Sequence, residues 1–275
     1  MEHRRWRARA AGLALVAASA VVPIVTEAPA SAATAPDLTV VILGGLGSMA
    51  ADYQGAGSIS NYLSTRAGTQ YQVKVFGLPS KGYTTDTSGV VEKVDTLTKK
   101  FKDWMAVEVK TSSVVLVAHS AGGLVARNYV KTVDKGARVK KVLLNGVANY
   151  GTVFLSQGND YEVGSTFLAG LNAGDVSVGS VRYWPIITVY DEIVWPYENQ
   201  VMPRTGGTRS TSVSFPYVKP NPFPGLGAPD PQITNVILQE SCPTLYVPHI
   251  GMTKANAVQT VVGQILDDKP ISVPC

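Results

Sequence analysis

The stretch SSVVLVAHSAGGLVAR, residues 112–127, decides the fold of this chain. Its first half is a run of apolar and β-branched residues that predicts a buried strand, and apolar residues at helical spacing follow Gly123. Between the two halves stands Ser120, with Ala118 two residues before it and Gly122 two residues after it. A sharp strand-to-helix turn requires small residues at those two places, because it lifts the serine side chain out of strained backbone. The pattern predicts a nucleophile elbow; the alternative is a turn in which Ser120 only caps the helix.

A serine hydroxyl becomes a good nucleophile only beside a base that accepts its proton. The chain has three histidines, His3, His119 and His249. His3 lies in an N-terminal segment that we expect to be removed, and the side chain of His119 should leave the elbow in another direction. The sequence therefore predicts His249 as the base, on a loop after an apolar run at 244–247 that we expect to be the last strand.

An acid should lie between the serine and the histidine in the chain. Asp191 directly follows the apolar run 185–190, which predicts a strand that ends beside it. Glu192 is the nearest competitor, but neighbouring side chains point in different directions, so only one of the two should face His249. Asp134 and Asp160 lie in polar or glycine-rich stretches and are expected to be solvated. We predict Asp191 as the acid, the alternative being an aspartate that only caps a turn.

The negative charge of a tetrahedral intermediate needs two backbone N–H donors. One is predicted from Ala121, directly after the serine. The other is predicted from Leu46, in the glycine-rich loop that follows the strand 38–43. That loop also matches the dinucleotide fingerprint G-x-G-x-x-A, but no acid follows the second predicted strand, 71–76, where such a site needs one.

The N-terminus has the pattern of a secretory signal peptide. Four arginines precede an apolar stretch, and the stretch ends in the small residues Ala30-Ser31-Ala32. We predict cleavage after Ala32, so that residues 1–32 are the signal peptide and residues 33–275 the catalytic domain of a secreted protein. An exported chain with two cysteines, Cys242 and Cys275, predicts one disulfide, which would tie the C-terminus to the segment leading to His249.

Composition excludes several classes of protein. The formal net charge is only +4, and it falls to +2 when residues 1–32 are removed, so no polyanionic partner is expected. Basic residues are not interleaved with aromatic ones, and no histidines, cysteines or carboxylates have metal-ligand spacing. The sequence thus predicts no nucleic-acid partner, no metal and no cofactor.

Predicted strands and helices alternate along the chain, which implies a mostly parallel sheet with helices on both faces. The predicted helices lie at 56–66, 90–105, 121–132 and 254–266, and the remaining strands at 113–118 and 139–145. Two stretches interrupt the alternation. Residues 152–183 would form a short cap over the site or else contribute to the core, and residues 203–231 would form a rim loop.

Four motifs resemble secreted triacylglycerol lipases of the class 2 type and, more distantly, fungal lipases of the B type. They are Ala118-His119-Ser120-Ala121-Gly122-Gly123-Leu124, Asn149-Tyr150-Gly151-Thr152-Val153, Tyr190-Asp191-Glu192-Ile193-Val194-x-Pro196 and Cys242-Pro243 followed by His249. The third motif is the most specific. The resemblance implies an α/β-hydrolase fold, supports Asp191 over Glu192, and implies hydrolysis of acyl glycerols or similar lipid esters.

The sequence as a whole predicts a monomeric, secreted serine ester hydrolase that acts on a lipid or small ester and contacts a lipid interface at most transiently. Two alternatives remain open: an esterase or acyltransferase on the same scaffold, and a non-catalytic binding protein that keeps the fold.

Overall fold

The structure, a computed structural model, describes residues 36–68, 70–78, 91–154, 159–202 and 230–275. The chain divides into the units Met1–Thr34 and Ala35–Cys275, and every described residue belongs to the second unit. The predicted signal peptide and nearly all of the predicted rim loop lie outside the described residues.

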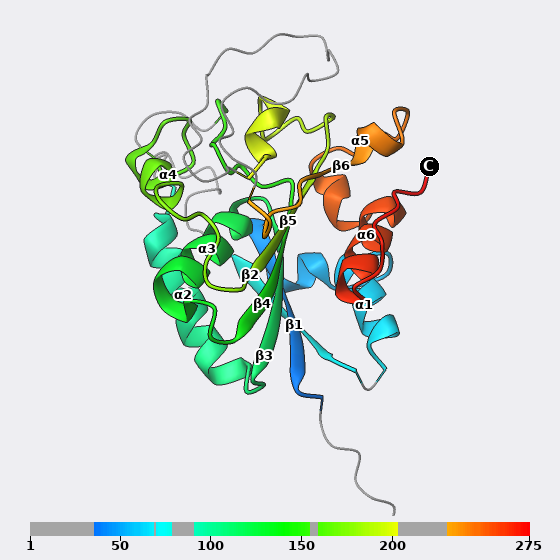
Figure 1. The fold of residues 1–275 in the computed structure, drawn as a ribbon, viewed down its shortest axis with the longest axis horizontal. Coiled ribbons are helices and arrows are strands. Elements are labelled where there is room, and N and C mark those ends of the chain that lie inside the picture. The colour runs from blue at the N-terminus through cyan, green and yellow to red at the C-terminus, as the bar shows by residue number, and fades with distance from the viewer. Residues whose placement is uncertain (1–35, 69, 79–90, 155–158, 203–229) are drawn as a thin grey trace, which may run out of the picture. The chain divides into compact units, whose positions relative to one another are not determined.

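A single sheet of six parallel strands forms the centre of the second unit (Figure 1). The strands follow the order β2-β1-β3-β4-β5-β6. This confirms the predicted, mostly parallel sheet. Their bounds are β1 Leu38–Leu46, β2 Gln72–Leu78, β3 Ser113–His119, β4 Val139–Asn145, β5 Arg182–Ile187 and β6 Val236–Ile237.

Helices cover both faces of the sheet, as predicted (Figure 1). On one face lie α2, α3 and α4, and on the other lie α1 and α6. The helices are α1 Ile59–Ala67, α2 Val94–Glu108, α3 Ala121–Tyr129, α4 Thr166–Leu171, α5 Leu238–Ser241 and α6 Asn256–Leu266. Shorter helical turns are Ala50–Tyr53, Tyr197–Gln200, Ile250–Thr253 and the π-helical Val130–Asp134, which continues α3.

Alternate side chains of each strand enter two different cores. In β1, Val41 and Leu43 belong to the core beneath α2 and α3, while Val40 and Ile42 belong to the core beneath α1 and α6. Successive strand residues point to opposite faces, so a sheet covered on both sides needs apolar residues at nearly every position. This explains why the strands appear in the sequence as continuous apolar runs.

Three predicted strands differ clearly from the structure. The first was expected to end at residue 43, but β1 continues to Leu46, so Leu46 ends a strand and does not lie in the loop after it. Residues 244–247 form no strand, and the last strand is the short β6. The run is bounded by Pro243 and Pro248, which have no N–H to donate to a ladder, and the Tyr246 side chain within it is exposed. Similarly, β5 ends at Ile187 rather than at residue 190, because side-chain amides take the next N–H groups: Gln200 binds that of Thr188, and Gln239 binds that of Val189.

Two acids expected to be solvated are buried instead. The Asp160 carboxylate accepts a hydrogen bond from the Val94 N–H at 2.8 Å and thereby caps the start of α2. The Asp134 carboxylate accepts one from the Val139 N–H at 3.0 Å, where β4 begins. Each acid accepts an N–H group at the start of a helix or strand. The pattern of apolar residues in the sequence does not reveal such a role.

The predicted cap segment divides between core and surface. Leu168 and Leu171 of α4 are buried in the same core as α3. Val153 and Phe154, at the beginning of the segment, are exposed. The segment therefore contributes to the core and also leaves apolar side chains at the surface.

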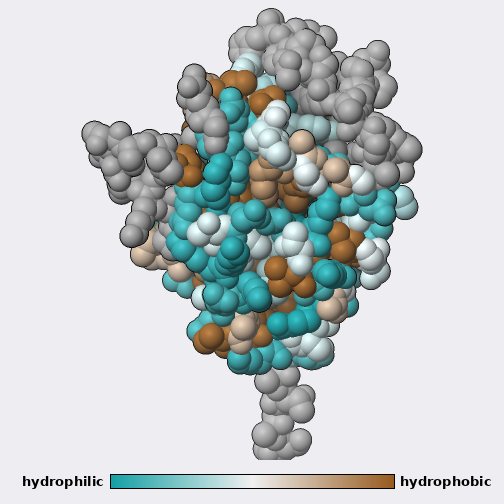
Figure 2. Space-filling view, turned by 90° about the vertical axis from the view of Figure 1, so that its left-hand side faces the viewer, coloured by the Kyte–Doolittle hydropathy of each residue, from teal (hydrophilic) through white to brown (hydrophobic). Residues whose placement is uncertain are grey.

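The face that carries α2, α3 and α4 is mostly hydrophilic, with small, separate apolar groups (Figure 2). Within the described part of the chain, no helix combines the length and the apolar character needed to span a bilayer.

Candidate active site

Ser120 is the single residue between β3 and α3, and its backbone is strained. Its φ of 55° and ψ of −132° lie where a side chain is rarely tolerated. Although Ser120 occupies the position of a helix cap, its side chain makes no capping hydrogen bond. The hydroxyl is directed instead to a histidine from the far end of the chain. The alternative in which Ser120 merely caps α3 does not fit this geometry.

The residues two positions from Ser120 are small for a visible reason. The side chain of Ala118 is fully buried, and Gly122 packs against the end of β1. A Cβ on Gly122 would lie 3.0 Å from the carbonyl oxygen of Leu43 and even closer to that of Gly44. The turn can therefore approach the end of β1 only if residue 122 has no side chain.

His249 joins the serine to an acid. Its Nε2 lies 2.9 Å from Ser120 Oγ, and its Nδ1 lies 2.8 Å from Asp191 Oδ2. A carboxylate only accepts, so Nδ1–H donates to Asp191 and leaves Nε2 of the neutral ring free to accept the serine proton. The structure thus brings together the three side chains that the sequence singled out, from segments 71 and 58 residues apart in the sequence.

Asp191 is held by the turn that follows it. Its Oδ1 accepts hydrogen bonds from the N–H groups of Ile193 at 2.9 Å and Val194 at 2.6 Å. The side chain is completely buried, and that of His249 is only 3% exposed. One carboxylate oxygen is therefore fixed by the backbone while the other faces the imidazole.

Glu192 also contacts His249, contrary to the expectation that only one of the two acids would face it. Glu192 Oε2 accepts the backbone N–H of His249 at 2.9 Å, while Asp191 binds the ring. Adjacent side chains do point in different directions, but the loop of His249 passes close enough to present its ring to one and its backbone to the other.

Gly146 is a functional position that the sequence reasoning missed. It follows β4 with a φ of 58°, and a Cβ there would lie 3.2 Å from Asp191 Oδ2 and 3.4 Å from His249 Nδ1. Glycine tolerates positive φ and leaves this space open. The available signal was a glycine directly after a buried strand that neighbours the elbow strand.

The two predicted oxyanion donors, Ala121 and Leu46, belong to different elements. Ala121 follows Ser120 as the first residue of α3, and Leu46 ends β1 in register with Leu78. The end of β1 passes close to the elbow, because a Cβ on Gly45 would lie 3.2 Å from Ser120 Cβ. The N–H of Gly45 itself is taken by Tyr53 Oη at 2.6 Å.

His119 does not reach the Ser120 hydroxyl, as expected. Its ring is buried between Tyr53 and the backbone of His249, with contacts at both nitrogens. Burial, and then the charge of His249, lower the pKa of His119 to about 3. His119 is therefore neutral at any ordinary pH.

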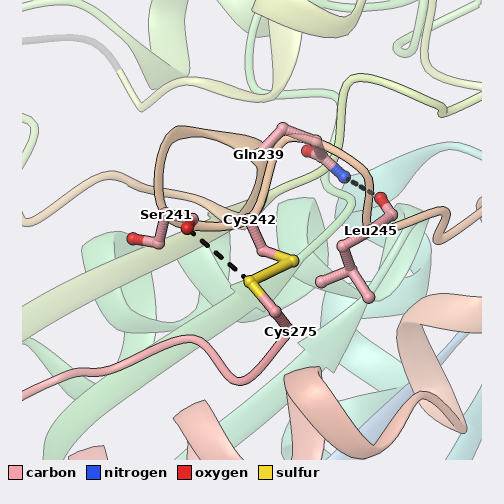
Figure 3. Close-up of a disulfide and its surroundings, with 5 residues drawn as sticks. All are labelled: Gln239, Ser241, Cys242, Leu245 and Cys275. Atoms are coloured by element: carbon pink, nitrogen blue, oxygen red, sulfur yellow. Dashed lines mark hydrogen bonds between the residues drawn. A yellow bond between two sulfur atoms is a disulfide. The ribbon is translucent and has the colours of Figure 1, made fainter.

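A disulfide joins Cys242 to Cys275, as predicted (Figure 3). It links the turn after α5 to the end of the chain, across a separation of 33 residues, with Cα atoms 5.4 Å apart. Beside it, the Gln239 amide donates to the carbonyl of Leu245 at 2.8 Å (Figure 3). The segment that leads to His249 is thus held by a covalent bond and by a side-chain hydrogen bond.

Several exposed apolar side chains lie close in the sequence to the predicted site residues. Tyr190 precedes Asp191, Ile250 follows His249, and Met49 lies three residues beyond Leu46. Tyr246 is 69% exposed and its ring lies 5.1 Å from that of Tyr190. Large apolar side chains at such positions favour contact with an apolar ligand.

The described residues contain no cluster of histidine, cysteine and acidic side chains that could hold a metal ion. The arrangement of Ser120, His249 and Asp191 is suited to nucleophilic chemistry.

Comparisons with known proteins yield structural likenesses only. No protein-family model matches the chain, and no curated protein matches it. Among solved structures, a pyrethroid hydrolase from Sphingobium faniae is 12% identical over 84% of this chain and 98% of its own, with a TM-score of 0.46. Phospholipase PlaB from Legionella pneumophila is 13% identical over 55% of this chain, with a TM-score of 0.42.

The chain covers only 39% of that phospholipase's length. The RedJ thioesterase from Streptomyces coelicolor is 16% identical over 63% of this chain and 76% of its own, with a TM-score of 0.39. Sequence identities this low do not show that the chain shares the activity of any of these proteins. The α/β-hydrolase fold is recognised in the parallel sheet, the strained serine after β3 and the chain order Ser120, Asp191, His249.

Proposed function

We propose that this protein is a serine carboxylester hydrolase with Ser120 as nucleophile, His249 as general base and acid, and Asp191 as the group that orients the histidine. The observation that carries the proposal is the pair of contacts at His249: Nε2 lies 2.9 Å from Ser120 Oγ, and Nδ1 lies 2.8 Å from Asp191 Oδ2. Both distances are those of direct hydrogen bonds, so a proton can pass from the serine to the histidine without rearrangement.

The reaction begins when Ser120 Oγ attacks the ester carbonyl carbon and its proton moves to His249 Nε2. The Asp191 carboxylate stabilises the imidazolium that forms. The N–H groups of Leu46 and Ala121 donate to the oxyanion, whose charge is largest in the tetrahedral intermediate. His249 then protonates the leaving alcohol, and an acyl-enzyme remains on Ser120. Water, activated by the same histidine, releases the acid and restores the serine.

For the substrate we propose a lipid ester, with acyl glycerols as the first candidates. The exposed apolar side chains of Tyr190 and Ile250, which adjoin Asp191 and His249 in the sequence, support this proposal, because apolar side chains can contact an acyl chain. The resemblance of the Asp191 motif to triacylglycerol lipases supports it too. The structural neighbours include a phospholipase, a thioesterase and a pyrethroid hydrolase by name, so esters other than glycerides belong in the test.

The test compares the parent with Ser120→Ala on nitrophenyl and glyceryl esters of increasing chain length. We expect Ser120→Ala to lower kcat by about 10⁵- to 10⁶-fold while the protein stays folded. Ser241→Ala, which changes an exposed serine of α5 in the same way, should leave kcat unchanged. A Ser120→Ala variant that kept a tenth of the parent activity would exclude Ser120 as the nucleophile.

Two measurements separate the proposal from its alternatives. A fluorophosphonate should label the parent at Ser120, whereas a binding protein that only keeps the fold would remain unlabelled. Product analysis with added alcohol distinguishes water from alcohol as the acyl acceptor. A new ester as the main product would replace hydrolase by acyltransferase on the same three residues.

We further propose that the protein is exported and cleaved after Ala32. The arginines before the apolar N-terminal stretch and the disulfide between Cys242 and Cys275 support this location. N-terminal sequencing of the protein from the culture medium should begin within a few residues of Ala33. Protein found only inside the cell with an intact N-terminus would contradict export.

A further inference from the structure

His119 is a buried side chain with two polar contacts for which the proposed reaction has no use. Its Nδ1 lies 2.8 Å from Tyr53 Oη, and its Nε2 lies 3.0 Å from the backbone carbonyl oxygen of His249. The ring is only 4% exposed, and its centroid is 4.7 Å from that of the His249 ring. A polar side chain this deeply placed, with both nitrogens engaged, links two segments that the site needs.

The direction of each hydrogen bond follows from the chemistry of the partners. A carbonyl oxygen only accepts, so His119 Nε2 carries the ring proton and donates it to His249. Nδ1 of the neutral ring must then accept from the Tyr53 hydroxyl. The same phenol oxygen accepts the Gly45 N–H at 2.6 Å. The result is one continuous chain from Gly45 through Tyr53 and His119 to the backbone of His249.

Both side chains keep the protonation state that this chain requires. Burial lowers the pKa of His119 to about 3, so its ring remains neutral and does not compete with His249 for the serine proton. Burial also raises the pKa of the Tyr53 hydroxyl above its usual value, so Tyr53 retains the proton that it donates.

Both ends of this hydrogen-bonded chain lie near the serine: a Cβ on Gly45 would lie 3.2 Å from Ser120 Cβ, and His249 Nε2 lies 2.9 Å from Ser120 Oγ. Gly45 directly precedes Leu46, the proposed oxyanion donor, and His249 is the proposed base. The backbone of His249 is fixed at its N–H by Glu192 and at its carbonyl by His119. Displacing a reacting group by about 1 Å can reduce the rate about 100-fold, so this fixation matters for the chemistry and not only for stability.

We infer that Tyr53 and His119 are positioning residues that hold the oxyanion loop at Gly45 and the backbone of His249 in one hydrogen-bonded frame. The inference rests on the proposed ester hydrolysis and adds to it two residues that act through the backbone of Gly45 and His249.

The first test compares His119→Met with His119→Gln in the full chain. The two replacements have similar shape, but only glutamine offers an N–H donor that can reach the carbonyl of His249. We expect His119→Met to lower kcat about 10- to 100-fold with KM within about twofold of the parent. His119→Gln should recover most of that loss. A merely structural role would lower the melting temperature of both variants alike and leave kcat of the folded protein unchanged.

The second test removes one hydroxyl group. Tyr53→Phe keeps the ring but deletes the acceptor for Gly45 and the donor to His119, and kcat should fall about tenfold. Tyr71→Phe is the matched control: Tyr71 is also buried, its hydroxyl donates to the Leu63 carbonyl at 3.2 Å, and it lies before the start of β2, away from the site. The control should lose stability only. If His119→Met does not fold, Tyr53→Phe still tests the frame.

Fluorophosphonate labelling of the parent at Ser120 separates the two proposals. If the parent reacts and the His119→Met and Tyr53→Phe variants turn over within twofold of it, the positioning role is wrong and ester hydrolysis stands. Equal losses in His119→Met and His119→Gln would likewise exclude the hydrogen bond as the cause. A parent that neither reacts nor hydrolyses any ester would overturn both proposals.

Discussion

At the scale of single residues, Gly122 illustrates how closely the elbow approaches the end of β1. A Cβ at this position would press on the backbone carbonyls of Leu43 and Gly44. Backbone atoms cannot yield as a flexible side chain can, so the loop that leads to Leu46 would have to move. A small residue at position 122 is therefore needed both for the turn itself and for the position of the segment that leads to Leu46.

We predict that Gly122→Ala lowers the free energy of unfolding by about 1–3 kcal/mol, as overpacking does. It should also lower kcat, because the displaced loop carries a proposed oxyanion donor. Gly170→Ala in α4 is the control: no atom lies within 4 Å of its added Cβ, so stability should be unchanged or rise by about 0.4–1 kcal/mol. Denaturant titration and ester kinetics measure both. A fully active Gly122→Ala would show that the loop tolerates the methyl group.

Asp191 and His249 should act as one unit with Ser120. His249→Ala alone should lower kcat nearly as much as Ser120→Ala does. A second substitution, at His249 or at Asp191, should lower the kcat of Ser120→Ala only a little further. The physical reason is that a base without its nucleophile, or a nucleophile without its base, contributes almost nothing. Kinetics of the single and double variants test this, and full additivity of the logarithmic losses would contradict the triad.

At the scale of elements, the disulfide ties the end of the chain after α6 to the turn after α5. The sequence suggested that this bond also positions His249. The structure adds two contacts between the disulfide and the histidine: Gln239 binds the Leu245 carbonyl, and Thr188 Oγ1 donates to the Val247 carbonyl at 2.7 Å. These contacts hold the segment even without the covalent bond.

We therefore predict that the double variant Cys242→Ser, Cys275→Ser loses about 3–4 kcal/mol of stability, the value of the chain-entropy model for a loop of this size. At temperatures where it is still folded, its kcat should stay within a few-fold of the parent. Thermal unfolding and ester kinetics provide the two numbers. A large loss of kcat in the folded variant would restore the positioning role to the disulfide.

At the scale of the whole molecule, the buried His119 makes stability depend on pH. Its pKa is about 3 in the folded protein against an ordinary value of 6.5. Between these two values the unfolded chain binds a proton that the folded protein excludes. The contribution to stability is therefore complete above pH 6.5 and is lost as the pH falls toward 3.

We predict that the free energy of unfolding of the parent falls more steeply with acid than that of His119→Gln. The difference in slope should be about 1.4 kcal/mol per pH unit below pH 6.5. Other titrating groups are common to both proteins and cancel in the comparison. Denaturant titrations at several pH values would reveal the difference, and parallel curves would show that burial does not lower the pKa of His119.

The sequence by itself indicated five of the six strands and singled out the three side chains that the structure brings together, because their signals are local. An apolar run, a small-serine-small turn and the carboxyl end of a strand can each be recognised within about ten residues. The predicted strands were wrong where other groups take the place of strand-to-strand hydrogen bonds. Prolines stand at both ends of the run 244–247, and the side chains of Gln200 and Gln239 accept the N–H groups that follow β5.

Only the tertiary structure decided what surrounds those three residues. It showed that Glu192 binds the backbone of His249, that Gly146 leaves room for the Asp191–His249 pair, and that Tyr53 joins Gly45 to His119. Each of these contacts joins segments that are distant in the sequence or depends on which way a loop turns. The periodicity of side chains specifies which face of an element is buried, but not which distant polar group meets it there.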